Sequence, residues 1–161
     1  MNRIQVQKEP IEISVIQDEL RAENPAVGAL VTFVGLMRDM NEGDCVATMT
    51  LEHYPGMTEK ALEDIVREAR RRWDLLGVRV VHRVGELRPL DPIVVVAVTS
   101  THRGEAFRAC EFLIDYLKTR APFWKKERTP DGERWVDARH SDTEAEKRWS
   151  ADSPKDDDIR G

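Results

Sequence analysis

Three segments of the chain carry basic side chains that could bind one anion between them. In chain order these residues are Arg38, His102, Arg103, Lys118, Lys125 and Lys126. His102 and Arg103 stand at the predicted start of a helix, where free backbone N–H groups and the helix dipole favour negative charge. Cations that face one pocket repel one another, and a shared anionic ligand offsets that repulsion. The pattern therefore predicts an anion-binding pocket in a chain whose net charge is −5.

Each of these residues also has an ordinary structural interpretation. Lys118 could be an exposed helix lysine paired with Asp115 three residues earlier. His102 could simply cap the helix, and Lys125 and Lys126 could be solvated loop residues. For each lysine considered alone, the structural interpretation is favoured. However, three segments that flank one helix each contribute a cation, and this combination favours a common pocket.

The elements that must position these residues follow from hydrophobic periodicity. The apolar run at 93–99 is typical of a buried strand, and apolar residues then recur at about 3.6-residue spacing until Pro122. This predicts a strand, a short turn and an amphipathic helix. His102 and Arg103 would begin that helix, and Lys118 would lie in its last turn.

The rest of the chain predicts short strands and two further helices. A capping-box pattern at 14–17 starts one helix, and Thr58 caps a second helix that stops at Gly77. Strands are expected at 4–7, 28–34, 45–53 and 78–84, and a turn at 129–132 leads into 134–136. In the strand 45–53, Cys45, Met49 and Leu51 are expected to face inward.

The composition and the order of elements indicate one α+β domain. The apolar fraction of 40% and the charged fraction of 34% are typical of a globular protein. Strands and helices do not alternate regularly, so the predicted class is α+β over residues 1–149. The charged segment 150–161 is expected to be disordered, because it offers too little apolar surface to offset its ordering entropy.

Several classes of protein are disfavoured. No apolar run reaches the roughly 18 residues of a membrane span, and the N-terminus lacks the features of a signal peptide, so the cytoplasm is predicted. The net charge disfavours nucleic-acid binding. The four histidines are scattered, and Cys45 and Cys110 form no metal-type pair, so no metal or cofactor is expected. Both cysteines are predicted to be buried reduced thiols.

Several spaced motifs, between residues 28 and 149, resemble the family of large, catalytic subunits of molybdopterin synthase. Any one of them is weak, but their number and order make the resemblance specific. They are Phe33-Val34-Gly35-x-x-Arg38, Leu51-Glu52-x-Tyr54-x-x-Met57, His82-Arg83-x-Gly85, Ser100-x-His102-Arg103-x-x-Ala106-Phe107, Leu117-Lys118 and Pro122-x-Trp124-Lys125-Lys126-Glu127.

The resemblance implies an α/β-hammerhead-type fold with antiparallel and mixed sheets, and a homodimer at the centre of a heterotetramer. Each end would bind a small ubiquitin-like sulfur-carrier subunit whose C-terminal glycine is a thiocarboxylate. The implied reaction converts cyclic pyranopterin monophosphate to molybdopterin by two successive sulfur transfers, which build the dithiolene.

The resemblance also implies roles for individual residues. Lys118 and Lys125 would be the catalytic lysines near the incoming thiocarboxylate. Arg139 would reach the pocket from the other subunit. The remaining expected substrate-binding residues are Leu36, Met37, Arg38, His102 and Arg103 around the pterin phosphate and its neighbouring groups, with Lys126 and Glu127 on the same wall as the lysines.

A second interpretation is a non-catalytic anion-binding or adaptor module that recognises the acidic C-terminal tail of a partner. Such a module would bind the tail but form no dithiolene product. Turnover therefore separates the two interpretations.

Overall fold

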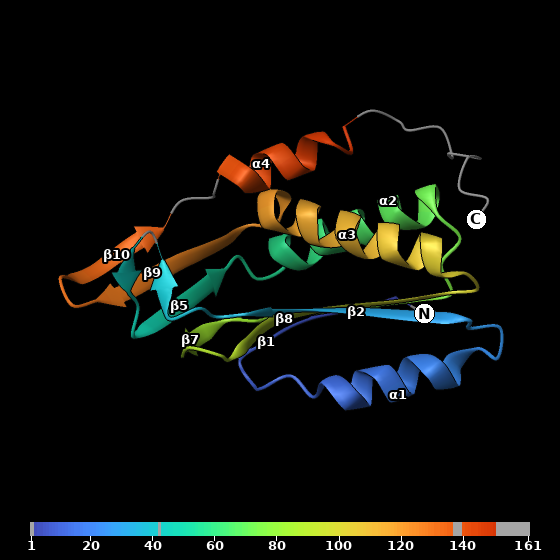
Figure 1. Cartoon of the computed structure of the whole chain (residues 1–161), viewed down its shortest axis with the longest axis horizontal. Helices are drawn as coiled ribbons and strands as arrows, with labels where there is room; N and C mark the ends of the chain where they lie inside the picture. The colour runs from blue at the N-terminus through green and yellow to red at the C-terminus, as the bar shows by residue number, and fades with distance from the viewer. Residues whose placement is uncertain (1, 42, 137–139, 151–161) are drawn as a thin grey trace.

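A computed structural model describes residues 2–41, 43–136 and 140–150. No α-helix in these ranges has both the length and the apolar character that a membrane crossing requires. The elements, drawn in Figure 1, are β1 (Asn2–Gln7), α1 (Ile13–Glu23), β2 (Ala29–Leu36), β3 (Met40–Asn41), β4 (Asp44–Cys45), β5 (Thr48–His53), α2 (Met57–Arg72), β6 (Gly77–Arg83), β7 (Gly85–Leu87), β8 (Pro92–Ser100), α3 (Arg103–Arg120), β9 (Phe123–Thr129), β10 (Gly132–Val136) and α4 (His140–Lys147).

Two four-stranded sheets form the framework. The central sheet has the order β1-β6-β8-β2, in which β1 is parallel to β6 and the other pairs are antiparallel. The second sheet has the order β10-β9-β5-β7 and is antiparallel. β3 and β4 form a separate short antiparallel pair. Mixed and antiparallel sheets beside helices confirm the predicted α+β class.

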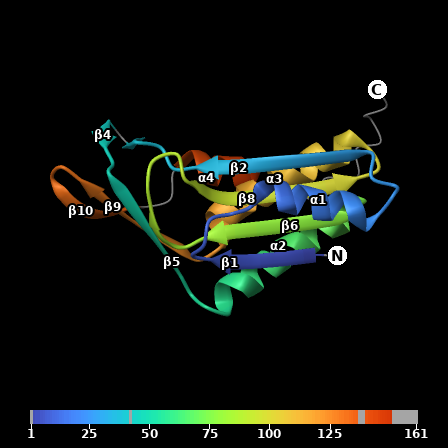
Figure 2. The same cartoon turned by 90° about the horizontal axis from the view of Figure 1, so that it is seen from below.

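Helices cover both faces of the central sheet. α1 packs on one face, and α2 and α3 pack on the other (Figures 1 and 2). Along β8, Val94 and Val96 belong to the core under α2 and α3, whereas Val95 and Ala97 belong to the core under α1. A strand that is covered on both faces needs apolar residues on both. This is why its sequence is a continuous apolar run.

The second sheet extends from one end of the central sheet (Figure 1). Thr58 helps to fix this joint: its hydroxyl accepts a hydrogen bond from the backbone N–H of Tyr54 at 3.1 Å and donates one to the carbonyl of Pro122 at 3.0 Å. The start of α2 is thereby tied to the link between α3 and β9. A compact apolar cluster fills the joint: Met37, Val46, Met49, Leu51, Leu87 and Ile93.

The predicted capping of the first two helices is wrong in detail. α1 begins at Ile13 and not at Ser14, and no side chain caps its N-terminus. The N-cap of α2 is Gly56, whose φ of +86° suits glycine, and the Glu59 carboxylate accepts its N–H at 2.5 Å. The Thr58 hydroxyl instead makes its two hydrogen bonds at the joint between the sheets, with Tyr54 and Pro122.

The predicted end of α2 is also wrong. The helix ends at Arg72, and Gly77 is the first residue of β6. A side chain at Gly77 would lie 2.8 Å from Leu20. This glycine therefore serves close packing and not the termination of a helix.

The predicted strand at 45–53 is interrupted after Cys45. Met49 and Leu51 face inward as expected, but Cys45 is exposed and Val46 is buried. The expectation of a buried Cys45 thiol is therefore wrong, because the break between β4 and β5 resets the alternation of side chains. Cys110 is buried as predicted, and burial raises the pKa of its thiol to about 11.

Candidate active site

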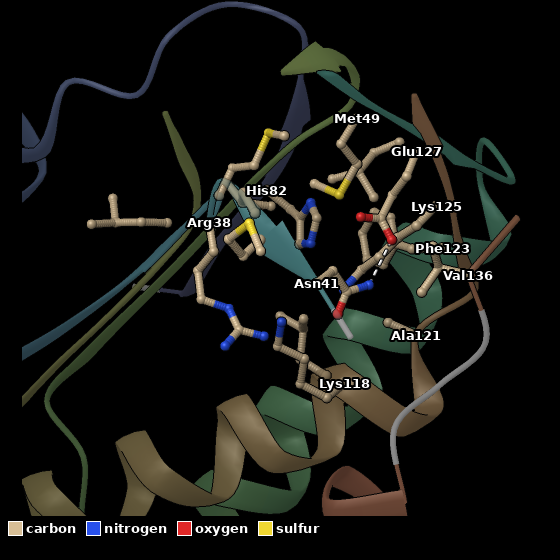
Figure 3. Close-up of a pocket in the computed structure, with 16 residues that line it drawn as sticks. Arg38, Asn41, Met49, His82, Lys118, Ala121, Phe123, Lys125, Glu127 and Val136 are labelled. Atoms are coloured by element: carbon tan, nitrogen blue, oxygen red, sulfur yellow. Dashed lines mark hydrogen bonds between the residues drawn. The ribbon is translucent and has the colours of Figure 1, made fainter. Parts of the chain in front are cut away.

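A cavity of about 300 Å³ opens where the central sheet, the second sheet and the last turn of α3 meet. Cavities of this size suit small organic ligands. Six residues that the sequence marked as site candidates line it (Figure 3): Leu36, Met37, Arg38, Lys118, Lys125 and Glu127. The structure thus brings together residues that are up to 91 positions apart in the chain, from Leu36 to Glu127.

Backbone hydrogen bonds hold the segment that carries Arg38. The N–H of Met37 donates to the carbonyl of Asp91 at 3.0 Å, and the N–H of Leu90 donates to the carbonyl of Met37 at 2.8 Å. The Met37 side chain is buried in the joint between the sheets, whereas Arg38 is exposed. Figure 3 shows the Arg38 guanidinium on the side of the cavity to which α3 contributes Lys118.

Two lysines reach the cavity from different elements. Lys118 follows the buried Leu117 in the last turn of α3. Lys125 lies on β9, directly opposite Leu51 of β5. Both lysines are half-buried. Partial removal from water strengthens the attraction between their ammonium groups and an anion.

Lys126 does not line this cavity, contrary to the expectation that it shares a wall with Lys125. Its Nζ lies 2.8 Å from the Glu133 carboxylate and 5.6 Å from the centroid of Trp135, both on β10. Hydrogen bonds from Lys126 and Arg128 hold the pKa of Glu133 below its ordinary value. Successive side chains of a strand point to opposite faces. An inward Lys125 therefore places Lys126 outward.

Glu127 places a carboxylate among the cationic side chains that line the cavity. It is 4% exposed and accepts a hydrogen bond from the Asn41 amide at 2.6 Å (Figure 3). Arg134 lies 4.0 Å away. A buried charge is costly unless it is paired and hydrogen-bonded, and these two neighbours meet that need. Glu127 thus joins β9 to the β3 segment.

His82 is a cavity residue to which the sequence analysis assigned no role. It is 5% exposed, and its ring stacks on Phe123 with centroids 3.8 Å apart at 16°. Burial, together with the positive charges of Lys118 and Lys125, lowers the pKa of His82 to about 3. The imidazole is therefore neutral near pH 7. Its place in the motif His82-Arg83-x-Gly85 was the only signal available in the sequence.

His102 and Arg103 begin α3 as predicted, but they lie far from the cavity. His102 occupies the N-cap position without a side-chain cap bond, and both residues are exposed. β2 and β8 are antiparallel, so His102, after Ser100, and Arg38, after Leu36, follow opposite ends of the pair. Eight residues at about 3.4 Å each separate them by roughly 25 Å. A single anion site made of Arg38, His102 and Arg103 from one chain is therefore contradicted.

Two further expectations concern Arg139 and metals. Arg139 lies outside the described residues. No cluster of three or more His, Cys, Asp or Glu side chains suited to a metal occurs within residues 2–41, 43–136 and 140–150. Among the described residues that line the cavity, the polar groups are the cations of Arg38, Lys118 and Lys125, the Glu127 carboxylate, the Asn41 amide and the neutral His82 imidazole.

The chain is similar to known proteins over most of its length. Residues 6–120 match the model of the family described as MoaE protein. A molybdopterin synthase catalytic subunit from Escherichia coli K12 is 63% identical over 128 residues, which cover 80% of this chain and 85% of that protein. Another from Ralstonia nicotianae is 57% identical over 149 residues, which cover 92% of this chain and 85% of that protein. A solved structure of the molybdopterin biosynthesis MoaE protein from Burkholderia ambifaria has a TM-score of 0.81 at 58% identity and covers 94% of this chain and 99% of that chain.

Proposed function

This chain belongs to the MoaE family, and on that premise we propose that it is the catalytic subunit of a molybdopterin synthase. It transfers sulfur from the thiocarboxylated C-terminal glycine of a small ubiquitin-like carrier to cyclic pyranopterin monophosphate. Two such transfers form the dithiolene of molybdopterin. The observation that carries the proposal is the convergence of Arg38, Lys118 and Lys125, from three separate segments, on one cavity.

The charges of the cavity suit this reaction. The substrate phosphate and the carrier thiocarboxylate are both anions, and they repel each other as they approach. Fixed cations in a partly dry cavity offset that repulsion and stabilise the negative charge that develops during transfer. We assign Lys118 and Lys125 to the reacting thiocarboxylate, and Leu36, Met37 and Arg38 to the pterin substrate.

The carrier subunit is the proposed protein partner, and the cytoplasm is the proposed location. The cavity lies at the joint between the two sheets, where Lys125 and Glu127 sit on β9. An extended C-terminal tail would have to reach this joint to present its thiocarboxylate. Because the cavity supplies three cations, the tail would enter with its negative end first.

The central experiment mixes the purified protein with a thiocarboxylated carrier and cyclic pyranopterin monophosphate. We expect molybdopterin to form in a single turnover, and a carrier that ends in an ordinary carboxylate serves as the control. Binding of the carrier without any dithiolene product would instead support the adaptor interpretation.

A second copy of the chain would explain the distance between Arg38 and His102. We propose a homodimer in which His102 and Arg103 of one protomer complete the anion site that Arg38 begins in the other. Sedimentation should then give a dimer at micromolar concentration. A stable monomer across that range would contradict the proposal.

Mixed dimers provide a sharper test of the shared site. Arg38→Ala and His102→Ala should each be nearly inactive alone. If the two chains exchange at random, half of the dimers are mixed, and each mixed dimer holds one intact site. We therefore expect recovery of about a quarter of the wild-type activity. No recovery after verified exchange would mean that His102 of one protomer does not complete the site that Arg38 begins in the other.

Lys125 and Lys126 should differ sharply, although they are adjacent and carry the same charge. Lys125→Ala removes a cation from the cavity, and we expect the single-turnover rate to fall at least about 10-fold. Lys126→Ala breaks a surface contact with Glu133, and such pairs contribute about 0–1 kcal/mol. Its rate should stay within about 2-fold of wild type. Equal losses in the two variants would contradict the inward and outward placement on β9.

A further inference from the structure

The side chain of His82 lines the cavity, but the proposed function assigns it no role. Its Nδ1 lies 2.7 Å from the backbone carbonyl of Arg83. A carbonyl oxygen can only accept, so Nδ1 must carry the proton. In a neutral imidazole the other nitrogen then has a free lone pair. Nε2 of His82 is therefore a hydrogen-bond acceptor in the wall of the cavity.

Two contacts fix the direction of this acceptor. The ring stacks on Phe123 of β9, and its Nδ1–H is bound to the backbone at the end of β6. With both the ring plane and one edge held, Nε2 can point in only one direction. Figure 3 shows the ring projecting into the space bordered by Arg38, Lys118 and Glu127.

The titratable groups around the ring come from every element packed near it. They are mostly cationic, and the charges of Lys118 and Lys125 both lower the pKa of the ring. By element, they are Arg38 after β2, His53 on β5, Lys118 on α3, and Lys125 and Glu127 on β9.

We propose that His82 is a positioning residue for Lys118, and that its neutral Nε2 accepts a hydrogen bond from the lysine ammonium and aims it at the reacting groups. This role rests on the proposed sulfur transfer. A carboxylate in the same place would also orient the lysine, but it would cancel its charge and repel both anionic reactants. A protonated imidazole would repel the lysine. A neutral, buried and rigidly held acceptor orients Lys118 and leaves the cavity cationic.

The test compares two substitutions with a matched control. His82→Phe keeps a flat ring against Phe123 but has no acceptor, whereas His82→Gln restores a neutral acceptor oxygen. We expect the single-turnover rate to fall about 10- to 100-fold in His82→Phe and to recover at least partly in His82→Gln. The control is His53→Phe. His53 is a half-buried histidine 3.5 Å from Glu59 and outside the cavity lining, and this variant should keep the wild-type rate.

The pH dependence gives a readout that a merely structural histidine would not change. A hydrogen bond to the ammonium favours the charged lysine, so its loss lowers the pKa of Lys118. The limb of the pH–rate profile that reports Lys118 should therefore move to lower pH by about 1 unit in His82→Phe. The sign is the same whether Lys118 acts as a base or as a cation. His53→Phe should leave the limb in place.

The outcomes separate this inference from the proposed function. If wild-type protein makes molybdopterin but His82→Phe keeps its rate and its pH limb, the positioning role is wrong and the function stands. A loss of rate that Gln does not restore, with an unmoved limb, also overturns the role. If His82→Phe fails to fold, His82→Leu, which also lacks an acceptor, takes its place, and NMR titration of the labelled Lys118 side chain is compared with wild type. A lower Lys118 pKa in His82→Leu supports the acceptor role, and an unchanged value overturns it.

Discussion

Lys118→Ala should reduce single-turnover formation of molybdopterin by about 10²- to 10⁴-fold, which is the range for loss of a positioned acid–base group. Lys118 is one of the two lysines in the cavity, and it belongs to the rigid α3 helix. The fold should survive, because the side chain is only half-buried and alanine favours a helix. Rate, thermal melting and carrier binding should be measured on the same preparation.

Arg120→Ala is the matched control for Lys118→Ala. Arg120 lies in the same last turn of α3, but it is exposed, pairs with Glu146 and lies over the Tyr116 ring. It should keep a rate close to wild type. A near wild-type rate in Lys118→Ala would refute the catalytic assignment. Loss of carrier binding along with activity would instead identify Lys118 as a docking residue.

Phe112→Ala should lower the free energy of unfolding by about 3–5 kcal/mol. Phe112 is fully buried in α3. Its ring lies 5.3 Å from Trp73, 4.3 Å from Tyr116 and 5.6 Å from Trp149, and the Arg72 guanidinium lies 4.8 Å from its centroid. Truncation leaves a cavity between α2, α3 and Trp149, which lies two residues after the end of α4. Urea unfolding at fixed protein concentration measures the change.

Phe107→Ala is the control for this loss of stability. Phe107 lies on the same helix five positions earlier, but it is 60% exposed. Its truncation should change the free energy of unfolding by less than about 0.5 kcal/mol. A loss of less than about 1 kcal/mol in Phe112→Ala would contradict the prediction. It would mean that the neighbouring aromatic rings close the space left by the Phe112 ring, and that α3 does not depend on this ring for its stability.

Local patterns predicted the elements that hold the site. The apolar run at 93–99 and the 3.6-residue spacing after it correspond to β8 and α3, and the turn at 129–132 joins β9 to β10. These predictions succeeded because β8 is buried on both faces and α3 buries one continuous stripe. The predicted helix ends were wrong where the residue expected to begin or end the helix makes a tertiary contact instead. Thr58, for example, bridges to Pro122 and does not cap α2.

The sequence by itself also determined the kind of chemistry, since the spaced motifs and the basic residues indicated an anion site and the family. Only the tertiary structure decided which of those residues meet. The antiparallel register of β2 and β8 separates Arg38 from His102. The alternation along β9 turns Lys125 inward and Lys126 outward. His82 becomes a neutral cavity acceptor only because Phe123 stacks on it and the surrounding fold removes it from water. Strand alternation is a local property, but which side chains face the cavity depends in each case on contacts between residues far apart in the chain, and local sequence patterns do not encode these contacts.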